Sequence, residues 1–321
     1  MCSELRDALG SHELVSWEAG SSAPATDIEV LLASGGVSHT ELSNQPKMVL
    51  IQTTSTGYET IDVDAASEMG IWASYAPSGL TGNATSVAEF VILLLLGTSR
   101  DLQETLRSIH EKSATPRVHR SLNEKTVCIV GLGDIGLQAI DRLRPFGVLL
   151  LATDEHSENA PQGVVAFQPT QPLSAVADAD YVVVCARASK TNENLIDGNI
   201  IRGMKPGSIL INIARGTLVD EGELLVALRS GRISAIGLDV LREEPLSPTN
   251  QLLGVPQALI TPHIAALTDL TLTGTVGFVV KVIQDLSVGK LPRSLLNQPA
   301  EPRKHFDFVS QTLGVSVSRA R

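Results

Sequence analysis

The sequence has few cysteines, few aromatic residues and few basic residues, and each shortage excludes a class of protein. Its three cysteines, Cys2, Cys128 and Cys185, lie far apart and form no CxxC pair, so neither a disulfide framework nor a zinc site is predicted. Only 3% of the residues are aromatic, and 25 lysines and arginines stand against 35 acidic residues. Because nucleic-acid binding needs a basic surface and is helped by stacking rings, we exclude a nucleic-acid partner.

Long apolar runs are also missing. The longest strongly apolar stretch, residues 90–96, is well short of the ~20 residues that a membrane-spanning helix needs. The first ten residues include acidic side chains and lack the apolar core of a signal peptide. We therefore expect a cytoplasmic protein with no membrane partner and no bound metal ion.

What the chain does have is length and an alternation of apolar runs with helical segments. Its 321 residues exceed the usual size of one domain. Strands are predicted at 126–130, 148–153, 181–185, 208–213, 233–240 and 258–261, with helices at 137–146 and 221–229. This order is typical of a doubly wound parallel sheet, the Rossmann architecture.

A second, smaller α/β domain is expected beside it. Strands are predicted at 28–32, 48–52 and 71–73, and apolar helices at 85–104 and 271–286 would carry the chain between the domains. The fold prediction is therefore α/β, with a Rossmann domain over residues 91–274 and a flavodoxin-like domain formed by residues 1–90 and 275–321. Segments 154–172 and 297–305 are predicted to be loops. The chain opens on a helix, 3–9, where a strand is usual, which leaves open whether a first strand is missing.

A glycine motif follows the first strand of the large sheet. Gly131, Gly133 and Gly136 form GxGxxG, in which they permit a tight turn, the approach of a pyrophosphate and close packing of helix on strand. Asp134 and Ile135 lie in the first helical turn, whose N–H groups attract phosphate, and the Asp134 carboxylate can point away from it. The motif predicts a dinucleotide site.

Asp154 indicates which dinucleotide is bound. It ends the next strand, where its carboxylate would accept hydrogen bonds from an adenosine ribose. No arginine follows it to hold a 2′-phosphate, so NAD is favoured over NADP. The alternative is that Asp154 only caps the next turn.

Three segments in the second half carry further motifs: NIARGTLVDEGELLVAL from Asn212, GLDVLREEPL from Gly237 and TPHIAALT from Thr261. Together with the glycine motif they resemble the D-isomer-specific 2-hydroxyacid dehydrogenases, which include phosphoglycerate dehydrogenases and glyoxylate/hydroxypyruvate reductases. The resemblance covers residues 49–296. It implies an NAD-dependent oxidoreductase acting on CH–OH donors, which interconverts a small anionic 2-oxo acid and its D-2-hydroxy acid in a cleft between two domains. It also implies a homodimer, with residues 102–117 as a candidate arm.

The resemblance places the catalytic roles on Arg215, Glu244 and His263. A guanidinium can bind a carboxylate and the neighbouring carbonyl together, which suits Arg215 to a 2-oxo acid. An imidazole can supply a proton near neutral pH, and a carboxylate on its other nitrogen favours the charged ring, which suits His263 and Glu244. Each could instead be an ordinary surface residue, but all three follow strands, where open α/β sheets bind ligands.

The remaining contacts that the resemblance implies lie on other loops. Backbone N–H groups of Ser55, Thr56 and Gly57 would bind the substrate carboxylate. Further cofactor contacts are expected from four residues: Asn192, Ala214, Asp239 and Ala266. For Asp239, a strand-end hydrogen bond is as good an interpretation as a contact with the nicotinamide carboxamide.

Departures from the family pattern leave the substrate open. The segment between Pro77 and Asn83 is longer than usual, and Arg187 adds a positive charge where the family has none. Two other functions also stay open. One is an NAD(H)-sensing interaction protein, similar to the transcriptional corepressors that share this fold. The other is an enzyme of the same fold that acts on a different anion, such as formate or phosphite.

Overall fold

The computed structural model of the protein describes residues 1–10, 12–18, 21, 23, 27–169, 171–305 and 307–308. The chain divides into two compact units. The first combines Met1–Gly82 with Asp269–Arg321, and the second is Asn83–Thr268. The boundaries expected from the sequence, 90/91 and 274/275, lie a few residues further along the chain.

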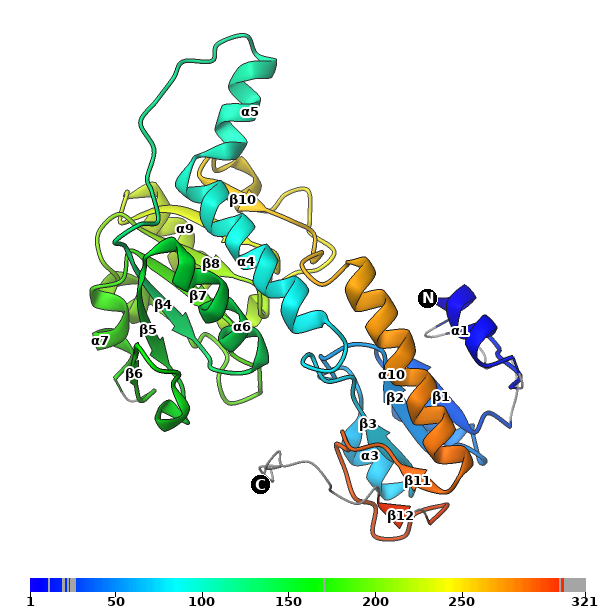
Figure 1. The fold of residues 1–321 in the computed structure, drawn as a ribbon. Helices are drawn as coiled ribbons and strands as arrows, with labels where there is room; N and C mark the ends of the chain where they lie inside the picture. Colours follow the sequence, from blue (N-terminus) through cyan, green and yellow to red (C-terminus); the bar gives the residue numbers. More distant parts are fainter. Residues whose placement is uncertain are drawn as a thin grey trace. The chain divides into compact units, whose positions relative to one another are not determined.

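A seven-stranded sheet forms the centre of the second unit (Figure 1), with the strand order β10-β9-β8-β7-β4-β5-β6. The strands are β4 (Thr126–Val130), β5 (Leu149–Thr153), β6 (Val164–Phe167), β7 (Tyr181–Val184), β8 (Ser208–Asn212), β9 (Ile233–Leu238) and β10 (Ala258–Ile260). Every neighbouring pair is parallel. The chain runs outward from β4 to β6, returns to β7 and then winds the other way, so the doubly wound Rossmann prediction is confirmed.

Helices cover both faces of this sheet because its strands are apolar on both sides. α4 (Asn83–Ser99) and α6 (Asp134–Leu143) pack on one face, and α7 (Pro172–Ala177), α8 (Gly198–Gly203) and α9 (Glu221–Arg229) pack on the other. The hydroxyl groups of Ser86 and Thr268, near the two ends of this unit, are hydrogen-bonded at 2.7 Å. The beginning and end of the second unit therefore meet.

Three local features differ from the sequence prediction. Segment 154–172, expected to be a loop, contains β6, an edge strand that is only partly buried and so has a weak apolar pattern. The single helix expected at 85–104 is two helices, α4 and α5 (Leu102–His110), separated at Asp101, whose φ is 48°. Pro145 lies in a 3₁₀ turn (Arg144–Phe146) after α6 rather than inside that helix.

The first unit is built on a three-stranded parallel sheet with the order β1-β2-β3. Its elements are α1 (Cys2–Ala8), β1 (Val30–Ala33), α2 (His39–Ser43), β2 (Leu50–Thr53), α3 (Val63–Glu68), β3 (Trp72–Ser74), α10 (Asp269–Ser287), β11 (Lys290–Leu291) and β12 (Asp307–Phe308). α1 and α10 pack on one face of the sheet, and α2 and α3 pack on the other. The expectation of a second, smaller α/β domain is confirmed.

The described residues contain neither a membrane-spanning helix nor a cluster of metal ligands. None of their helices is both long and apolar enough to cross a bilayer. None of their His, Cys, Asp and Glu side chains gather in threes or more in a way that could hold a metal ion.

Candidate active site

One edge of the seven-stranded sheet carries most of the residues that the sequence singles out. The glycine loop follows β4, Asn192 follows β7, Arg215 follows β8, Glu244 follows β9 and His263 follows β10. Because the strands are parallel, these loops all lie at the carboxyl edge. The direction of winding reverses between β4 and β7, and open α/β sheets bind ligands at such a point.

The glycine loop is closed around two of its glycines and open at the third. Gly131 has a φ of 102°, and a Cβ there would lie 2.7 Å from the backbone of Ala186. A Cβ on Gly136 would lie 2.0 Å from the carbonyl oxygen of Gly131. A Cβ on Gly133, by contrast, would meet no atom within 4 Å. Open space therefore lies in front of Gly133, at the position where the motif predicts the pyrophosphate.

Helix α6 begins directly at this open space. Gly133 is its N-cap residue and, having no side chain, makes no capping hydrogen bond. Asp134 and Ile135 form the first turn, as expected. The N–H groups of a first helical turn and the positive end of the helix dipole suit a phosphate, so the residues present fit a dinucleotide.

Asp154 connects the end of β5 to the glycine loop. Its Oδ2 accepts a hydrogen bond from the backbone N–H of Leu132 at 2.7 Å, and its Oδ1 accepts one from that of His156 at 2.8 Å. A carboxylate has about four acceptor positions, so a ribose hydroxyl can still bind to it. Capping the turn and binding ribose are therefore compatible roles for this residue.

His263 and Glu244 form a hydrogen-bonded pair. The imidazole Nδ1 lies 2.7 Å from Glu244 Oε2, and the two side chains are 46% and 38% exposed. Glu244 Oε1 accepts a hydrogen bond from the backbone N–H of Leu241 at 3.0 Å, which fixes the carboxylate. An ionised carboxylate can only accept, so the pair requires the proton on Nδ1 and leaves Nε2 on the far side of the ring. The structure thus brings the expected acid/base residue and its partner together.

The turn that carries His263 is held by Asp239, which is 1% exposed. Asp239 Oδ1 accepts hydrogen bonds from the Thr261 hydroxyl at 2.6 Å and the Ile264 N–H at 2.9 Å, and Oδ2 accepts one from the Ala265 N–H at 2.8 Å. Its carbonyl oxygen accepts one from the His263 N–H at 2.7 Å. These are the strand-end hydrogen bonds that the sequence offers as the alternative to a carboxamide contact. They also hold His263 at a φ of 54°, in the left-handed region that disfavours residues with a Cβ.

Arg215 lies in a tight turn that a buried asparagine supports. Asn212, 1% exposed at the end of β8, donates a hydrogen bond from Nδ2 to the carbonyl of Arg215 at 2.9 Å and accepts one from the N–H of Ala214 at 3.1 Å. The Arg215 guanidinium donates from Nη1 to the carbonyl of Ala214 at 2.7 Å. Sequence reasoning missed Asn212, although a polar residue at the end of an apolar strand is a signal that could have found it.

The other expected contacts lie in three places. Asn192 closes its own loop, since its amide donates to the carbonyl of Arg187 at 2.8 Å and accepts from the N–H of Ser189 at 2.8 Å. Ala214 is buried in the core beside β8, so only its backbone can face a ligand. Ala266 packs partly buried against the core cluster under α4 and α6.

The loop of Ser55, Thr56 and Gly57 follows β2 in the first unit. Ser55 donates a hydrogen bond from its hydroxyl to the carbonyl of Gly57 at 2.8 Å, which curls the loop. Within the described part of the chain, no acceptor is found for the three backbone N–H groups, and the Thr56 hydroxyl is buried without a partner. Successive N–H groups of this kind suit an anion.

The thiol of Cys128 is not suited to act as a catalytic nucleophile. It is buried in the central strand β4, and burial raises its pKa to about 12. A thiol with so high a pKa is neutral near pH 7 and is not a nucleophile there.

Comparison with known proteins gives a consistent set of relatives. Residues 92–265 match the family model of the D-isomer specific 2-hydroxyacid dehydrogenase NAD binding domain. D-3-phosphoglycerate dehydrogenase of Mycobacterium leprae is 32% identical over 270 residues, which cover 81% of this chain and 50% of that protein. Human glyoxylate reductase/hydroxypyruvate reductase is 34% identical over 230 residues, 69% of each chain.

Solved structures agree. The NADPH-dependent glyoxylate/hydroxypyruvate reductase of Sinorhizobium meliloti, in complex with NADP and malonate, has a TM-score of 0.79 at 26% identity and covers 90% of both chains. The chain spans about half the length of the phosphoglycerate dehydrogenases that it matches.

Proposed function

The chain belongs to the D-isomer specific 2-hydroxyacid dehydrogenase family, and from this we propose that it is an NAD-dependent dehydrogenase that interconverts a small 2-oxo acid and its D-2-hydroxy acid. The observation that carries the proposal is the 2.7 Å contact between His263 Nδ1 and Glu244 Oε2, at the sheet edge that also carries the glycine loop. That edge thus holds both a dinucleotide-binding loop and a positioned proton donor.

NAD(H), when bound, supplies or accepts the hydride at C2 of the acid. Its proposed contacts are the glycine loop with the first turn of α6, the Asp154 carboxylate, and three residues further along the sheet edge: Asn192, Ala214 and Ala266. The negative charge of Asp154 disfavours a 2′-phosphate, so we propose NAD rather than NADP as the preferred cofactor.

The substrate is bound through its carboxylate. The planar guanidinium of Arg215 donates in parallel to the carboxylate and to the 2-oxo oxygen, which polarises the carbonyl group. In the first unit, the backbone N–H groups of Ser55, Thr56 and Gly57 are a second proposed anion site, of a kind that suits a carboxylate.

His263 moves the proton. During reduction its Nε2 donates a proton to the oxygen on C2 while Glu244 stabilises the charged ring, and during oxidation the neutral ring removes that proton. The reactants and products balance as 2-oxo acid, NADH and one proton on one side, and 2-hydroxy acid and NAD⁺ on the other.

A substrate screen with matched variants tests the proposal. Glyoxylate, hydroxypyruvate, phosphohydroxypyruvate and pyruvate are each tested with NADH and with NADPH, and formate and phosphite with NAD⁺. Arg215→Ala and His263→Ala should abolish turnover and keep NADH affinity, whereas His39→Ala and Arg202→Ala, at exposed positions, should change neither. NADH binding without turnover of any acid would favour the interaction protein, and turnover of formate or phosphite would favour the other rival.

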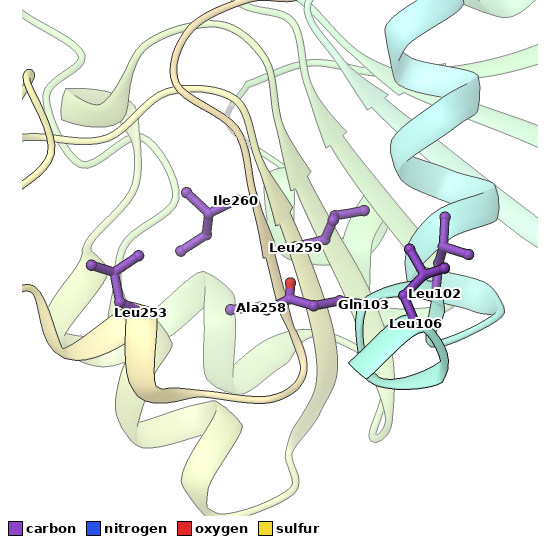
Figure 2. Close-up of a pocket in the computed structure, with 7 residues that line it drawn as sticks. All are labelled: Leu102, Gln103, Leu106, Leu253, Ala258, Leu259 and Ile260. Atoms are coloured by element: carbon purple, nitrogen blue, oxygen red, sulfur yellow. The ribbon is translucent and has the colours of Figure 1, made fainter. Parts of the chain in front are cut away.

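We also propose a homodimer formed through α5. No residue of this helix is buried, and Leu102, Leu106 and Ile109 are 39%, 51% and 57% exposed. Figure 2 shows the groove beside the helix, with the leucines of α5 on one side and Leu253, Leu259 and Ile260 on the other. A second copy of the chain would bury this apolar surface. Light scattering should show a dimer that Leu106→Asp converts to a monomer, whereas Val226→Asp, 62% exposed on α9, should leave it intact.

We propose a cytoplasmic location because the free thiols of Cys128 and Cys185 suit a reducing compartment. Cell fractionation tests this directly, and recovery of the protein outside the cytoplasm would contradict it.

A further inference from the structure

Arg242, two residues before Glu244, connects three loops at the carboxyl edge of the sheet. Its guanidinium donates from Nη1 to Glu193 Oε1 at 2.7 Å, and from Nη2 to Asn194 Oδ1 and to the carbonyl of Thr217 at 3.3 Å. Its backbone N–H donates to Glu221 Oε1 at 2.6 Å. We call these five residues the Arg242 clamp. They belong to the loop after β7, the turn after β8 with the start of α9, and the loop after β9.

The backbones of two of these loops touch at the residue after Arg215. A Cβ on Gly216 would lie 1.9 Å from the carbonyl carbon of Leu241 and 2.2 Å from the nitrogen of Arg242. The loop after β7 is tied to the same turn, since the N–H of Asn194 donates to the carbonyl of Thr217 at 2.9 Å. The guanidinium of Arg242 spans this junction, because Thr217 and Asn194 both accept from its Nη2.

We propose that Arg242 is a positioning residue, which sets the turn of Arg215 against the loop of Glu244 and so aligns the substrate-binding and proton-transferring groups. The inference rests on the proposed function. Both terminal nitrogens of Arg242 are engaged by protein acceptors, so its role is to hold geometry rather than to bind the substrate. Arginine suits it because a planar fork can serve three acceptors in fixed directions, whereas a lysine ammonium is a single point on a flexible stem.

The clamp matters for alignment more than for overall stability. The Arg242 and Glu193 side chains are 38% and 58% exposed, and ion pairs this exposed contribute little to folding. A misplacement of about 1 Å at a reacting group, however, lowers the rate by about 100-fold. Loss of Arg242 should therefore reduce kcat/KM strongly while the protein stays folded.

Steady-state kinetics of Arg242→Ala, Arg242→Lys and a matched control test this. The control is Arg202→Ala, which removes an ion pair of the same 2.7 Å length, between Arg202 and Glu223. Arg242→Ala should lower kcat/KM by about 10- to 100-fold, with KM for the 2-oxo acid raised and NADH affinity within twofold of wild type. Arg242→Lys should recover part of the loss, and Arg202→Ala should match wild type. A kcat/KM for Arg242→Ala within twofold of wild type overturns the proposal.

A double-mutant cycle separates alignment from a general structural effect. If Arg242 acts through the Glu244 loop, Arg242→Ala should cost much less in a Glu244→Gln background than in wild type. Additive losses contradict this. Should Arg242→Ala fail to fold, Glu193→Gln removes one arm of the clamp at an exposed position and should give a smaller change in the same direction. A Glu193→Gln protein identical to wild type then overturns the proposal.

Hydrogen exchange gives a readout that needs no turnover. Arg242→Ala should speed amide exchange in segments 193–196, 216–219 and 239–244 and leave the central strands unchanged, and Arg202→Ala should not affect these segments. If wild type turns over no 2-oxo acid, the proposed function fails, but this measurement still tests whether Arg242 holds the three loops in place. Unchanged amide exchange in the three segments overturns the proposal that Arg242 is a positioning residue.

Discussion

Replacing Asp239 by asparagine exchanges one buried carboxylate oxygen for an NH₂ group and leaves the size of the side chain nearly unchanged. In the native protein Oδ1 accepts from the Thr261 hydroxyl and the Ile264 N–H, and Oδ2 accepts from the Ala265 N–H. The variant can keep an oxygen at the first position, but its NH₂ group then faces the N–H of Ala265. One charge-assisted hydrogen bond is lost and a buried donor is left without an acceptor.

The expected loss of stability is about 1.5–3 kcal/mol, the value of one hydrogen bond to a charged group. The His263 turn should also relax, because a φ of 54° costs a residue with a Cβ roughly 1–2 kcal/mol and these bonds offset that cost. A shift of the imidazole by about 1 Å would lower kcat by about 100-fold. NADH affinity should stay within threefold of wild type, because the carboxylate is occupied by the turn.

Three measurements check Asp239→Asn: kcat at saturating NADH, the Kd of NADH from fluorescence, and unfolding in denaturant. Asp180→Asn is the matched control, since Asp180 also accepts hydrogen bonds from a backbone N–H, that of Thr126 at 3.0 Å, and from Lys205 at 2.7 Å. It precedes β7, at the amino edge, and should lose stability with kcat unchanged. An Asp239→Asn protein with unchanged kcat would refute the reasoning, and one with a much weaker Kd would show that the carboxylate contacts the nicotinamide instead.

Three further predictions follow from the glycine loop, the ribose site and the buried thiol. Gly133→Ala should keep the wild-type Tm and weaken NADH binding, because its Cβ enters open space. Gly136→Ala, whose Cβ would lie 2.0 Å from a carbonyl oxygen, should lower the free energy of unfolding by about 1–3 kcal/mol or more. Equal Tm values for the two variants would contradict this prediction. With the best 2-oxo acid, kcat/KM should be at least about tenfold higher with NADH than with NADPH, a difference of about 1.4 kcal/mol, because the charge on Asp154 repels the 2′-phosphate of NADPH. Equal kcat/KM values for the two cofactors would contradict this prediction. Since burial raises the pKa of Cys128 to about 12, its thiol stays neutral through pH 8, and mass spectrometry should find it alkylated by iodoacetamide only after denaturation; labelling of the native protein rules this out.

The sequence predicts the central strands of the large sheet to within about two residues, for a physical reason. Strands such as β7 and β8 are buried along their whole length, so they read as continuous apolar runs bounded by turn residues. The edge strand β6 is only partly buried and lacks that pattern. The break between α4 and α5 falls at Asp101, where no glycine or proline indicates the end of a helix.

The candidate site also has parts that the sequence predicts and parts that it does not. The glycine loop could be expected from a single short motif, and the pairing of Glu244 with His263 from two motifs, GLDVLREEPL and TPHIAALT, that together resemble one family. The bonds of Asp239 to the His263 turn join residues 22 to 26 positions apart, and that of Arg242 to Glu193 joins residues 49 positions apart. Such contacts depend on which loops meet at the sheet edge, so one sequence without coordinates does not reveal them.

In the sequence, the second unit is inserted between the two segments of the first unit, and this order has a consequence for how the protein is made. Residues 83–268 leave the ribosome as one continuous stretch whose ends meet, so this half can fold as soon as it has emerged. The first unit must wait, because Leu50 and Trp72 share one core cluster with Val279 and Val282 of α10. At about 5 to 20 residues per second the intervening 186 residues take about 10 to 40 s. One apolar face of β1–β3 therefore stays uncovered throughout that interval. We expect chaperones to bind the nascent amino-terminal segment there, because its apolar surface is exposed.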